Sequence, residues 1–410
     1  MIFVAAFVRT QLLSLRMSAF DQELKARLAA IRAQGLLREL RHVTSAQGPQ
    51  IEIDGRTLLN FSSNDYLGLA NHPSLKEAAI RATEKFGAGA GASRLICGSL
   101  APFHELEETL AAFKGTEAAL SFSTGYAAAI GTITALLGKD DIIIVDKLVH
   151  ACIVDAAKLS GAKLRVFAHN DLADLEDKLR WASAETKSTP HAPRFTLVAT
   201  ESVFSMDGDH APLTEIVTLK EKYGAWLMVD EAHATGLFGP IRRGLAEALG
   251  VSDRIEIQMG TLGKALGASG GYICGSRSLI DCLINRARSF IFSTAPVPAA
   301  AAAATAGIQV VQSGEGSTRV RTLWQRVKEL DSALNAAHTA APSAIIPLIL
   351  GDETKAVAAA TALRENGFFV PAIRFPTVAR GAARLRVTLT AAHTADDVAA
   401  LAARLRTLDR

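Results

Sequence analysis

The sequence predicts an α/β protein with a large, mostly parallel sheet covered by helices, followed by a smaller C-terminal α+β domain. Seven short apolar, strand-like runs occur between residues 118 and 274, and helical stretches separate most of them. Such runs are typical of strands buried on both faces, as in parallel sheets. Beyond residue 298 helices and strands alternate again, over a shorter stretch of the chain. The length of 410 residues leaves room for more than one domain.

The elements follow in order along the chain. Residues 21–41 carry apolar side chains at helical spacing between charges of both signs, which predicts an amphipathic helix. Residues 50–60 hold an Asp-Gly pair between two strand-like runs, which predicts a hairpin. The large sheet is predicted from runs at 118–122, 142–145, 164–167, 195–200, 225–229, 255–259 and 272–274. The small domain is predicted from helices around 319–338 and 355–366 and strands at 344–350, 368–373 and 383–389.

The predicted domain organisation has four parts. Residues 1–18 are expected to be a disordered or over-extended N-terminus, because the apolar start lacks a preceding basic region and a clear cleavage site. Residues 19–60 form the N-terminal helix and hairpin. Residues 61–295 are expected to form the large domain. Two prolines near residue 297 mark the start of the small domain, residues 296–410.

Composition narrows the possible partners. The formal net charge is only +3 and 21% of the residues are charged, which gives no reason to expect nucleic acid as a ligand. The four cysteines form no Cys-x-x-Cys pair and no metal-ligand cluster, so a reducing, cytoplasmic location without a metal is expected. The Ala-rich run at 299–306 is too short to cross a bilayer and predicts a packed helix, so no membrane association is expected.

Lys264 is the first candidate for chemistry. It is the only charged residue between Glu256 and Arg277, and its neighbours are small. A poorly solvated amine has a lowered pKa and can act as nucleophile and base. A phosphate-binding P-loop is excluded because Ala265 stands where the metal-binding hydroxyl should be, and the glycine spacing is wrong. A Schiff-base lysine and a lysine that merely follows a strand remain open.

Other candidates follow the ends of predicted strands, where ligands of parallel sheets bind. Asp230 and His233 follow the run at 225–229, and an Asp there could hold a pyridine nitrogen protonated or simply cap a helix. Gly125 and Tyr126 would begin a helix whose N–H groups suit a phosphate.

Two further strand ends carry polar side chains. Ser205 follows the run at 195–200, and it could bond to a ring substituent or belong to an ordinary turn. His150 follows the run at 142–145, and its imidazole could lie flat on a cofactor ring, although a lone histidine there is usually structural.

Four motifs together resemble the α-oxoamine synthases, which are fold type I pyridoxal-phosphate enzymes that join an amino acid to an acyl thioester with loss of CO2. The motifs are Phe122-Ser-Thr-Gly-Tyr126, the run from Thr200 to Asp209, Val229-Asp-Glu-Ala-His233 and Gly260-Thr-Leu-Gly-Lys264. The similarity runs from about Ala19 to the C-terminus.

The resemblance implies a role for each candidate. Lys264 would carry pyridoxal 5'-phosphate as a Schiff base, and Asp230 would pair with the pyridine nitrogen. His233 and Ser205 would lie near the phenolic oxygen, and His150 would stack on the ring and take part in catalysis. The phosphate would be held by Thr261 and by the backbone of Gly125 and Tyr126.

Residues 372–393 and Ala168-His-Asn-Asp171 are similar to the biotin-pathway member of the family, which condenses L-alanine with a pimeloyl thioester of CoA or acyl carrier protein. Two departures leave glycine C-acetyltransferase or another member of the family as the alternative. Phe375-Pro-Thr377 replaces the usual Pro-Pro-Thr, and Ser93-Arg-Leu-Ile-Cys-Gly98 is shared with that relative. The resemblance assigns substrate binding to Arg38, Asn64, His150, Thr377 and Arg386, with Arg386 on the amino-acid carboxylate and Arg38, in the N-terminal helix, on the acyl chain.

Ser293-Thr294 matches a segment that in this family reaches the phosphate of the partner subunit, so a homodimer is implied. Two other classes remain possible. An aminotransferase of the same fold would also use Lys264 and Asp230. A non-catalytic pyridoxal-binding regulator would need a further recognition domain, for which the sequence leaves no unassigned segment of sufficient length.

Overall fold

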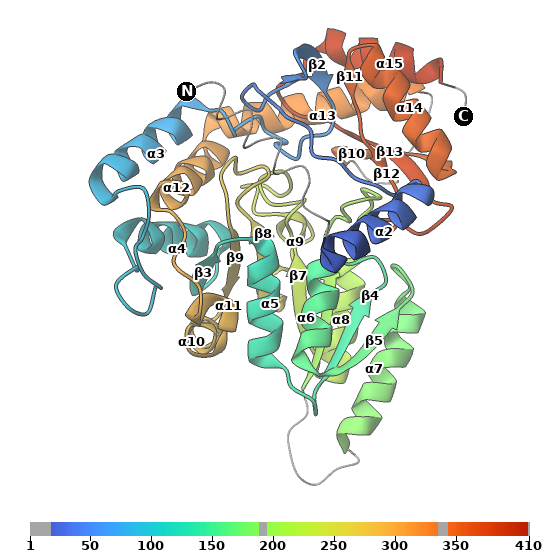
Figure 1. Ribbon diagram of the computed structural model, residues 1–410. Coiled ribbons are helices and arrows are strands. Elements are labelled where there is room, and N and C mark those ends of the chain that lie inside the picture. Colours follow the sequence, from blue (N-terminus) through green and yellow to red (C-terminus); the bar gives the residue numbers. More distant parts are fainter. Residues whose placement is uncertain (1–17, 188–194, 335–342, 409–410) are drawn as a thin grey trace.

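The computed structural model describes residues 18–187, 195–334 and 343–408, so the expectation for the first residues lies outside the described part. A seven-stranded sheet forms the lower half of the view in Figure 1. Its strand order is β3-β9-β8-β7-β6-β4-β5. The strands are β3 (Ala118–Phe122), β4 (Ile142–Asp146), β5 (Lys163–Phe167), β6 (Thr196–Glu201), β7 (Trp226–Asp230), β8 (Ile257–Thr261) and β9 (Gly271–Gly275).

The predicted mostly parallel sheet is confirmed. Strands β5, β4, β6, β7 and β8 pair in parallel, and only β9 runs antiparallel to both of its neighbours. Along β4 the side chains of Ile143 and Val145 enter one core cluster, whereas Ile142 and Ile144 enter another. Alternate residues point to opposite faces of a strand, so both faces must be covered.

Helices cover the two faces of this sheet (Figure 1). One face packs on α5 (Gly125–Leu136), α6 (Ala151–Ser160), α10 (Arg277–Arg286) and α11 (Arg288–Ile291). The other face packs on α7 (Leu172–Lys187), α8 (Leu213–Tyr223) and α9 (Leu245–Ala248). No helix in the described ranges is long and apolar enough to cross a membrane.

The C-terminal part contains a second, smaller sheet, as predicted. Strand β13 (Ala383–Thr388) pairs antiparallel with β10 (Ile345–Gly351) and β12 (Ala372–Ile373). The helices of this part are α13 (Gly314–Leu334), α14 (Glu353–Glu365) and α15 (Ala395–Arg406). The last residues of the helix predicted at 319–338 lie outside the described residues.

The single strand predicted at 368–373 is wrong, because this stretch forms two short strands in different sheets. Strand β11 (Phe368–Phe369) joins the N-terminal hairpin, whereas β12 joins β13. Pro371 stands between them. Proline has no N–H to donate to a ladder and therefore interrupts the strand.

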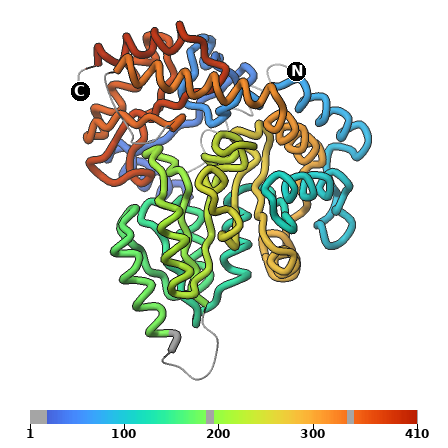
Figure 2. Tube along the Cα trace, turned by 180° about the vertical axis from the view of Figure 1, so that it is seen from behind, coloured from blue at the N-terminus to red at the C-terminus, as the bar shows by residue number. Residues whose placement is uncertain are grey.

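The N-terminal hairpin is confirmed as β1 (Gln50–Ile53) and β2 (Arg56–Asn60), which pair antiparallel. Asp54 and Gly55 have φ of 52° and 72°, as a tight two-residue turn requires. A strand from the C-terminal part extends the sheet of the hairpin, because β11 pairs in parallel with β2. Figure 2 shows the blue N-terminal segment lying among the red elements of the C-terminal part.

The N-terminal helix is shorter than predicted. Helix α2 spans Ala19–Ala33, and the chain leaves it at Gly35, whose φ is +67°. A glycine in this conformation is a common helix terminator. Residues 36–41 therefore form no helix, and the placement of Arg38 on the helix is wrong. The apolar side chains of α2 are not buried in this chain: Phe20, Leu24, Leu28 and Ile31 are exposed.

The Ala-rich segment forms helix α12 (Pro298–Gln312), which packs against α3 (Pro73–Phe86) and α4 (Ala101–Lys114), as Figure 1 shows. The predicted packed helix is confirmed. Its small residues permit close approach, since a Cβ at Gly307 would lie 2.2 Å from the carbonyl oxygen of Leu266. Helix α12 thus supports the loop that carries Lys264. The domain boundary proposed at residue 296 stays a prediction.

Candidate active site

The carboxyl ends of three neighbouring strands meet at one edge of the large sheet. Strand β6 ends at Glu201, which is the register partner of Asp230, the last residue of β7. Asp230 is in turn the partner of Met259 on β8. Lys264 lies in the loop that connects β8 to β9. The sheet topology therefore brings together side chains that are far apart in the sequence.

Lys264 makes a direct contact with His233. The Nζ atom lies 2.7 Å from His233 Nε2, and the other ring nitrogen, Nδ1, lies 2.5 Å from the hydroxyl oxygen of Tyr66. Burial lowers the pKa of His233 well below its usual value, and the charges of Lys264 and Arg386 lower it further. The ring is therefore neutral, and it donates from one nitrogen and accepts at the other.

The electrostatics of Lys264 suit proton transfer near neutral pH. Burial lowers the pKa of this amine to about 8, although the charge of the Asp230 carboxylate opposes the shift. A lysine with its usual pKa would be almost fully protonated and unable to act as a base. The lowered value that the isolated, small-residue surroundings predicted is thus present in the folded chain.

Asp230 is a buried carboxyl whose charge is only partly compensated. Its Oδ1 accepts a hydrogen bond from the backbone of Ala232 at 2.9 Å. Burial raises its pKa, while Lys264 and this hydrogen bond lower it. A protonated ligand nitrogen at this place would supply the missing positive charge.

The start of α5 forms a small cradle for an anion. The Thr124 hydroxyl caps the helix by accepting from Ala127 N at 3.0 Å, and the first N–H groups, at Gly125 and Tyr126, have no acceptor within the helix. Gly271 packs directly against this turn, because a Cβ at position 271 would lie 2.5 Å from Gly125 N.

Thr261 lies beside the start of α5, since a Cβ at Gly125 would lie 3.9 Å from the Thr261 Cβ. Thr261 Oγ1 donates to Gly270 O at 2.9 Å and accepts from Gly263 N at 3.3 Å. The Tyr126 ring turns elsewhere, because its hydroxyl donates to Asp155 at 2.8 Å.

His150 and Ser205 occupy the predicted positions after β4 and β6. His150 caps α6, since its Nδ1 accepts from Cys152 N at 3.2 Å, and its side chain is exposed. Ser205 is buried, and its carbonyl oxygen accepts from Arg386 Nε at 2.7 Å. This contact joins the loop after β6 to strand β13 of the C-terminal part.

Arg386 and Asn64 also meet. Both terminal nitrogens of the guanidinium donate to Asn64 Oδ1 at 3.2 Å. Arg38 donates to the carbonyl oxygen of Phe375 at 3.3 Å, so an extended segment rather than a helix carries it to the turn that contains Thr377. The described contacts do not link Arg38 or Thr377 to Lys264. Thr294 lies on the surface, bridged to Ser93.

Two residues near Lys264 were not predicted as site residues. Tyr66 is fully buried, and burial raises its pKa to about 12, so it keeps its proton. The sequence offered one indication of its role, because Tyr66 lies two positions after Asn64, which was predicted to bind substrate. Glu201 is buried beside Asp230, and it belongs to the quoted run from Thr200 to Asp209 without having been assigned a role.

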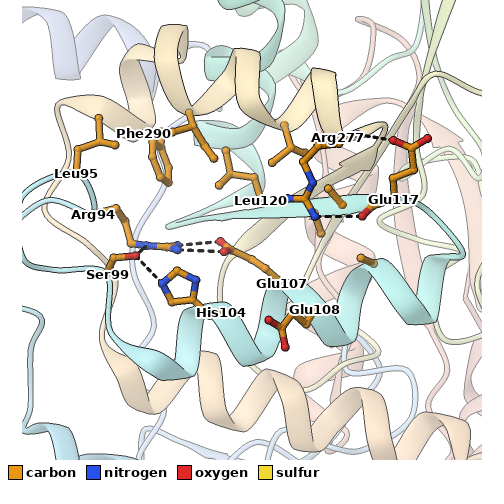
Figure 3. A pocket seen from close by; sticks show the side chains of 15 residues that line it. Arg94, Leu95, Ser99, His104, Glu107, Glu108, Glu117, Leu120, Arg277 and Phe290 are labelled. Carbon is orange, nitrogen blue, oxygen red and sulfur yellow. Dashed lines mark hydrogen bonds and ion pairs between the residues drawn. The ribbon is translucent and has the colours of Figure 1, made fainter.

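A cavity of about 500 Å³ lies elsewhere, between α4, β3 and α10 (Figure 3), and contains none of the predicted site residues. Arg94 forms two hydrogen bonds with the Glu107 carboxylate, at 2.8 and 3.0 Å. Glu107 also accepts from Ser121 N at 2.9 Å and so covers the outer edge of β3. Arg94 and Glu107 neutralise each other there, which favours a structural role for this pair.

Comparison with known proteins agrees with this fold. The family model described as Aminotransferase class I and II matches residues 56–405. An 8-amino-7-oxononanoate synthase of Anaeromyxobacter sp. (strain K) is 49% identical over 383 residues, 92% of this chain and 94% of the relative. A serine palmitoyltransferase variant from S. paucimobilis with a bound PLP-myriocin aldimine superposes with a TM-score of 0.87 at 30% identity, covering 96% of this chain and 98% of the other. An 8-amino-7-oxononanoate synthase from Francisella tularensis gives a TM-score of 0.70 at 27% identity, covering 85% and 97%.

The fold and the lysine site define a fold type I pyridoxal-phosphate enzyme. The chain belongs to the aminotransferase class I and II family. Within that family its relatives confirm the predicted resemblance to the α-oxoamine synthases.

The residues present fit pyridoxal phosphate. The site offers an amine with a lowered pKa for the aldehyde, a buried carboxylate for a protonated ring nitrogen, and a helix N-terminus for the phosphate. The carboxyl of Asp230 would otherwise be a buried charge with incomplete compensation.

Proposed function

We propose that this protein catalyses the decarboxylative condensation of L-alanine with a pimeloyl thioester, yielding 8-amino-7-oxononanoate, CO2 and the free thiol of the carrier. The observation that carries the proposal is the identity of 44–51% to several curated 8-amino-7-oxononanoate synthases over about nine-tenths of the chain. These relatives favour this reaction over the glycine C-acetyltransferase alternative.

Bound pyridoxal phosphate supplies a sink for the electrons left at the amino-acid Cα when its proton is removed. Asp230 would hold a proton on the ring nitrogen through its buried carboxylate. Thr261 and the N–H groups of Gly125 and Tyr126 would hold the phosphate. His150 would border the ring, and Ser205 would bind its phenolic oxygen.

Lys264 moves the proton. With a pKa lowered to about 8, the amine is partly deprotonated near neutral pH and can take the Cα proton and later return it. His233 orients the amine at 2.7 Å, and Tyr66 fixes the imidazole from its other side. A fixed, neutral imidazole keeps Lys264 aimed without adding a second positive charge.

The substrates are held by side chains from both parts of the chain. Arg386 binds the carboxylate of L-alanine, because a guanidinium makes charge-assisted paired hydrogen bonds to such a group. Asn64 orients this guanidinium. Arg38 and Thr377 receive the far carboxylate of the pimeloyl chain at the turn where Arg38 meets Phe375.

The active form is a homodimer in the cytoplasm. Four apolar side chains of α2, at positions 20, 24, 28 and 31, are exposed in the single chain, which favours burial by a second subunit. Ser293 and Thr294 would approach the phosphate of the partner site. The four cysteines are free thiols, in keeping with a reducing compartment.

Product analysis tests the proposal. Enzyme, L-alanine and pimeloyl-CoA should yield 8-amino-7-oxononanoate by mass spectrometry, with CO2 and free CoA in equal amounts. Two comparison assays use other substrates. The first contains acetyl-CoA and glycine, and the second contains a keto acid as amino acceptor. Equal turnover with acetyl-CoA and glycine would favour the acetyltransferase, and transfer of the amino group without CO2 would indicate an aminotransferase.

The lysine assignment is tested with borohydride, which should fix the cofactor on the peptide that contains Lys264. Lys264→Ala should abolish the labelling. Lys147→Ala is the matched control, because this exposed lysine follows β4 at the same end of the sheet. Labelling that persists in Lys264→Ala would contradict the assignment.

A further inference from the structure

Glu201 is a buried acid for which the proposed reaction has no role. It is 2% exposed, it ends β6, and its register partner across the parallel ladder is Asp230. Its Oε1 atom has no hydrogen-bond partner among the described residues. A buried carboxylate oxygen without a donor is costly if the group is ionised.

The surrounding charges favour a proton on Glu201 and the negative charge on Asp230. Burial and the Asp230 charge together raise the pKa of Glu201 to about 8, against Lys264 and the backbone N–H groups of His150 and Ser205, which lower it. Lys264 is the largest influence that lowers the pKa of either carboxyl, but the charge of His150 lowers that of Asp230 as well. Asp230 Oδ1 accepts a hydrogen bond from Ala232 N, whereas Glu201 Oε1 has no partner among the described residues, so Asp230 is the better compensated of the two. Two carboxyls side by side in a buried site do not both ionise readily.

We propose that Glu201 is a positioning residue of the cofactor site that acts as a neutral carboxylic acid, so that Asp230 is the one ionised carboxylate available to the ring nitrogen. A second negative charge here would compete with Asp230 for the positive charge of the ring and of Lys264. The neutral acid instead fills the space beside Asp230 and faces the backbone at His150 and Ser205, two residues that the proposed function assigns to the cofactor. The proposal rests on the proposed function only in taking pyridoxal phosphate as the ligand.

Glu201→Gln tests this role, because glutamine has nearly the same shape and is never charged. Glu231→Gln is the matched control. Glu231 is equally buried, but it is ion-paired with Lys114 Nζ at 2.6 Å. The dissociation constant for pyridoxal phosphate should stay within about threefold of wild type in Glu201→Gln. A loss of about tenfold or more would show that an ionised carboxylate is required and would overturn the proposal.

The melting temperature of the cofactor-free protein gives a second readout. The pKa of Glu201 is raised on folding, so the folded state binds more protons than the unfolded state between the usual value of 4.5 and about 8. Wild type should lose stability across this window relative to Glu201→Gln, and the difference should be constant above it. Glu231→Gln should melt lower at every pH. A pH-independent difference between wild type and Glu201→Gln would overturn the proposal.

Wild type alone provides a measurement that does not depend on the folding of a variant. Infrared difference spectra of protein labelled with 13C-glutamate should contain a protonated carboxyl band at pH 6 that disappears with a midpoint near the pKa of about 8. Absence of this band would overturn the proposal. Failure of the L-alanine and pimeloyl thioester assay would count against the proposed function but leave the infrared and melting results standing.

Discussion

Lys264 Nζ and His233 Nε2 lie 2.7 Å apart, although one residue follows strand β8 and the other follows β7. This contact fixes the direction of the amine before any substrate binds. It also means that changes in the loop after β7 act on the lysine itself. The geometry of the site therefore leads to predictions about residues that never touch the substrate as well as about those that do.

Asp230→Asn should keep the fold and lose at least ~10²-fold in kcat, the scale of removing one preorganised electrostatic partner. The amide cannot hold a proton on the ring nitrogen as the carboxylate does. Steady-state kinetics and the melting temperature of the variant check this. The exposed Asp253→Asn is the control and should leave both unchanged. Near-normal turnover of Asp230→Asn would mean that the partner of the ring nitrogen has been misassigned.

Arg38→Ala should raise KM for the pimeloyl thioester about ten- to a hundredfold, since a charge-assisted hydrogen bond contributes roughly 1.5–3 kcal/mol. Binding of L-alanine, followed by the absorption of the cofactor, should hardly change. Arg27→Ala is the matched control, because this exposed arginine of α2 pairs only with Glu23 in the described structure. An equal rise in KM for both variants would mean that losing any positive charge in this region weakens binding. It would contradict a specific binding role for Arg38.

Gly271→Ala should weaken pyridoxal-phosphate binding by about tenfold or more, because the new Cβ would lie 2.5 Å from Gly125 N and push the first turn of α5 out of place. Equilibrium dialysis measures the effect. Gly314→Ala is the control, since a Cβ there meets nothing within 4 Å. Unchanged affinity in Gly271→Ala would show that the start of α5 does not hold the phosphate.

His169 should make stability depend on pH. Its Nδ1 lies 2.9 Å from Asp146 and its Nε2 lies 2.7 Å from Asp209. Burial alone would lower its pKa, but the hydrogen bonds and charges of both carboxylates raise it to about 10. The contribution to stability is complete below pH 6.5 and is lost as the pH rises towards 10.

The corresponding variant is His169→Gln, which should melt below wild type by a margin that is largest near pH 6 and shrinks towards pH 10. Calorimetry at pH 6, 8 and 10 measures this margin. The exposed His42→Gln should follow wild type at every pH. A constant margin for His169→Gln would indicate that the histidine is not charged in the folded protein.

Much of the fold could be predicted because its strands are local apolar runs with distinct ends. The seven runs of the large sheet and the Asp-Gly hairpin all correspond to observed elements. The helix at 21–41 was predicted too long because its apolar spacing continues past Gly35, where the backbone turns out of the helix. Periodicity reports which face is apolar, and it does not report where a left-handed residue ends the element.

The candidate site could be predicted in part for a similar reason. Asp230 ends a strand, His233 and Lys264 follow strands, and the parallel topology brings strand ends together. Tyr66 lies outside the large sheet and reaches His233 only through the tertiary fold. Glu201 could not be predicted as a site residue from the sequence. Its place in the site depends on the register that sets it beside Asp230, and register is a property of the assembled sheet.

The pairing of β11 with β2 has a consequence for biosynthesis. The hairpin is complete once residue 60 has been made, yet the strand that pairs with its edge begins at Phe368. During translation the edge of β2 therefore waits, unpaired, until nearly the whole polypeptide has left the ribosome. Contacts between segments so distant in sequence form slowly, and open strand edges invite association with other chains. The edge of β2 is therefore the place where an incomplete chain is most open to association with other chains, until Phe368 and Phe369 are made.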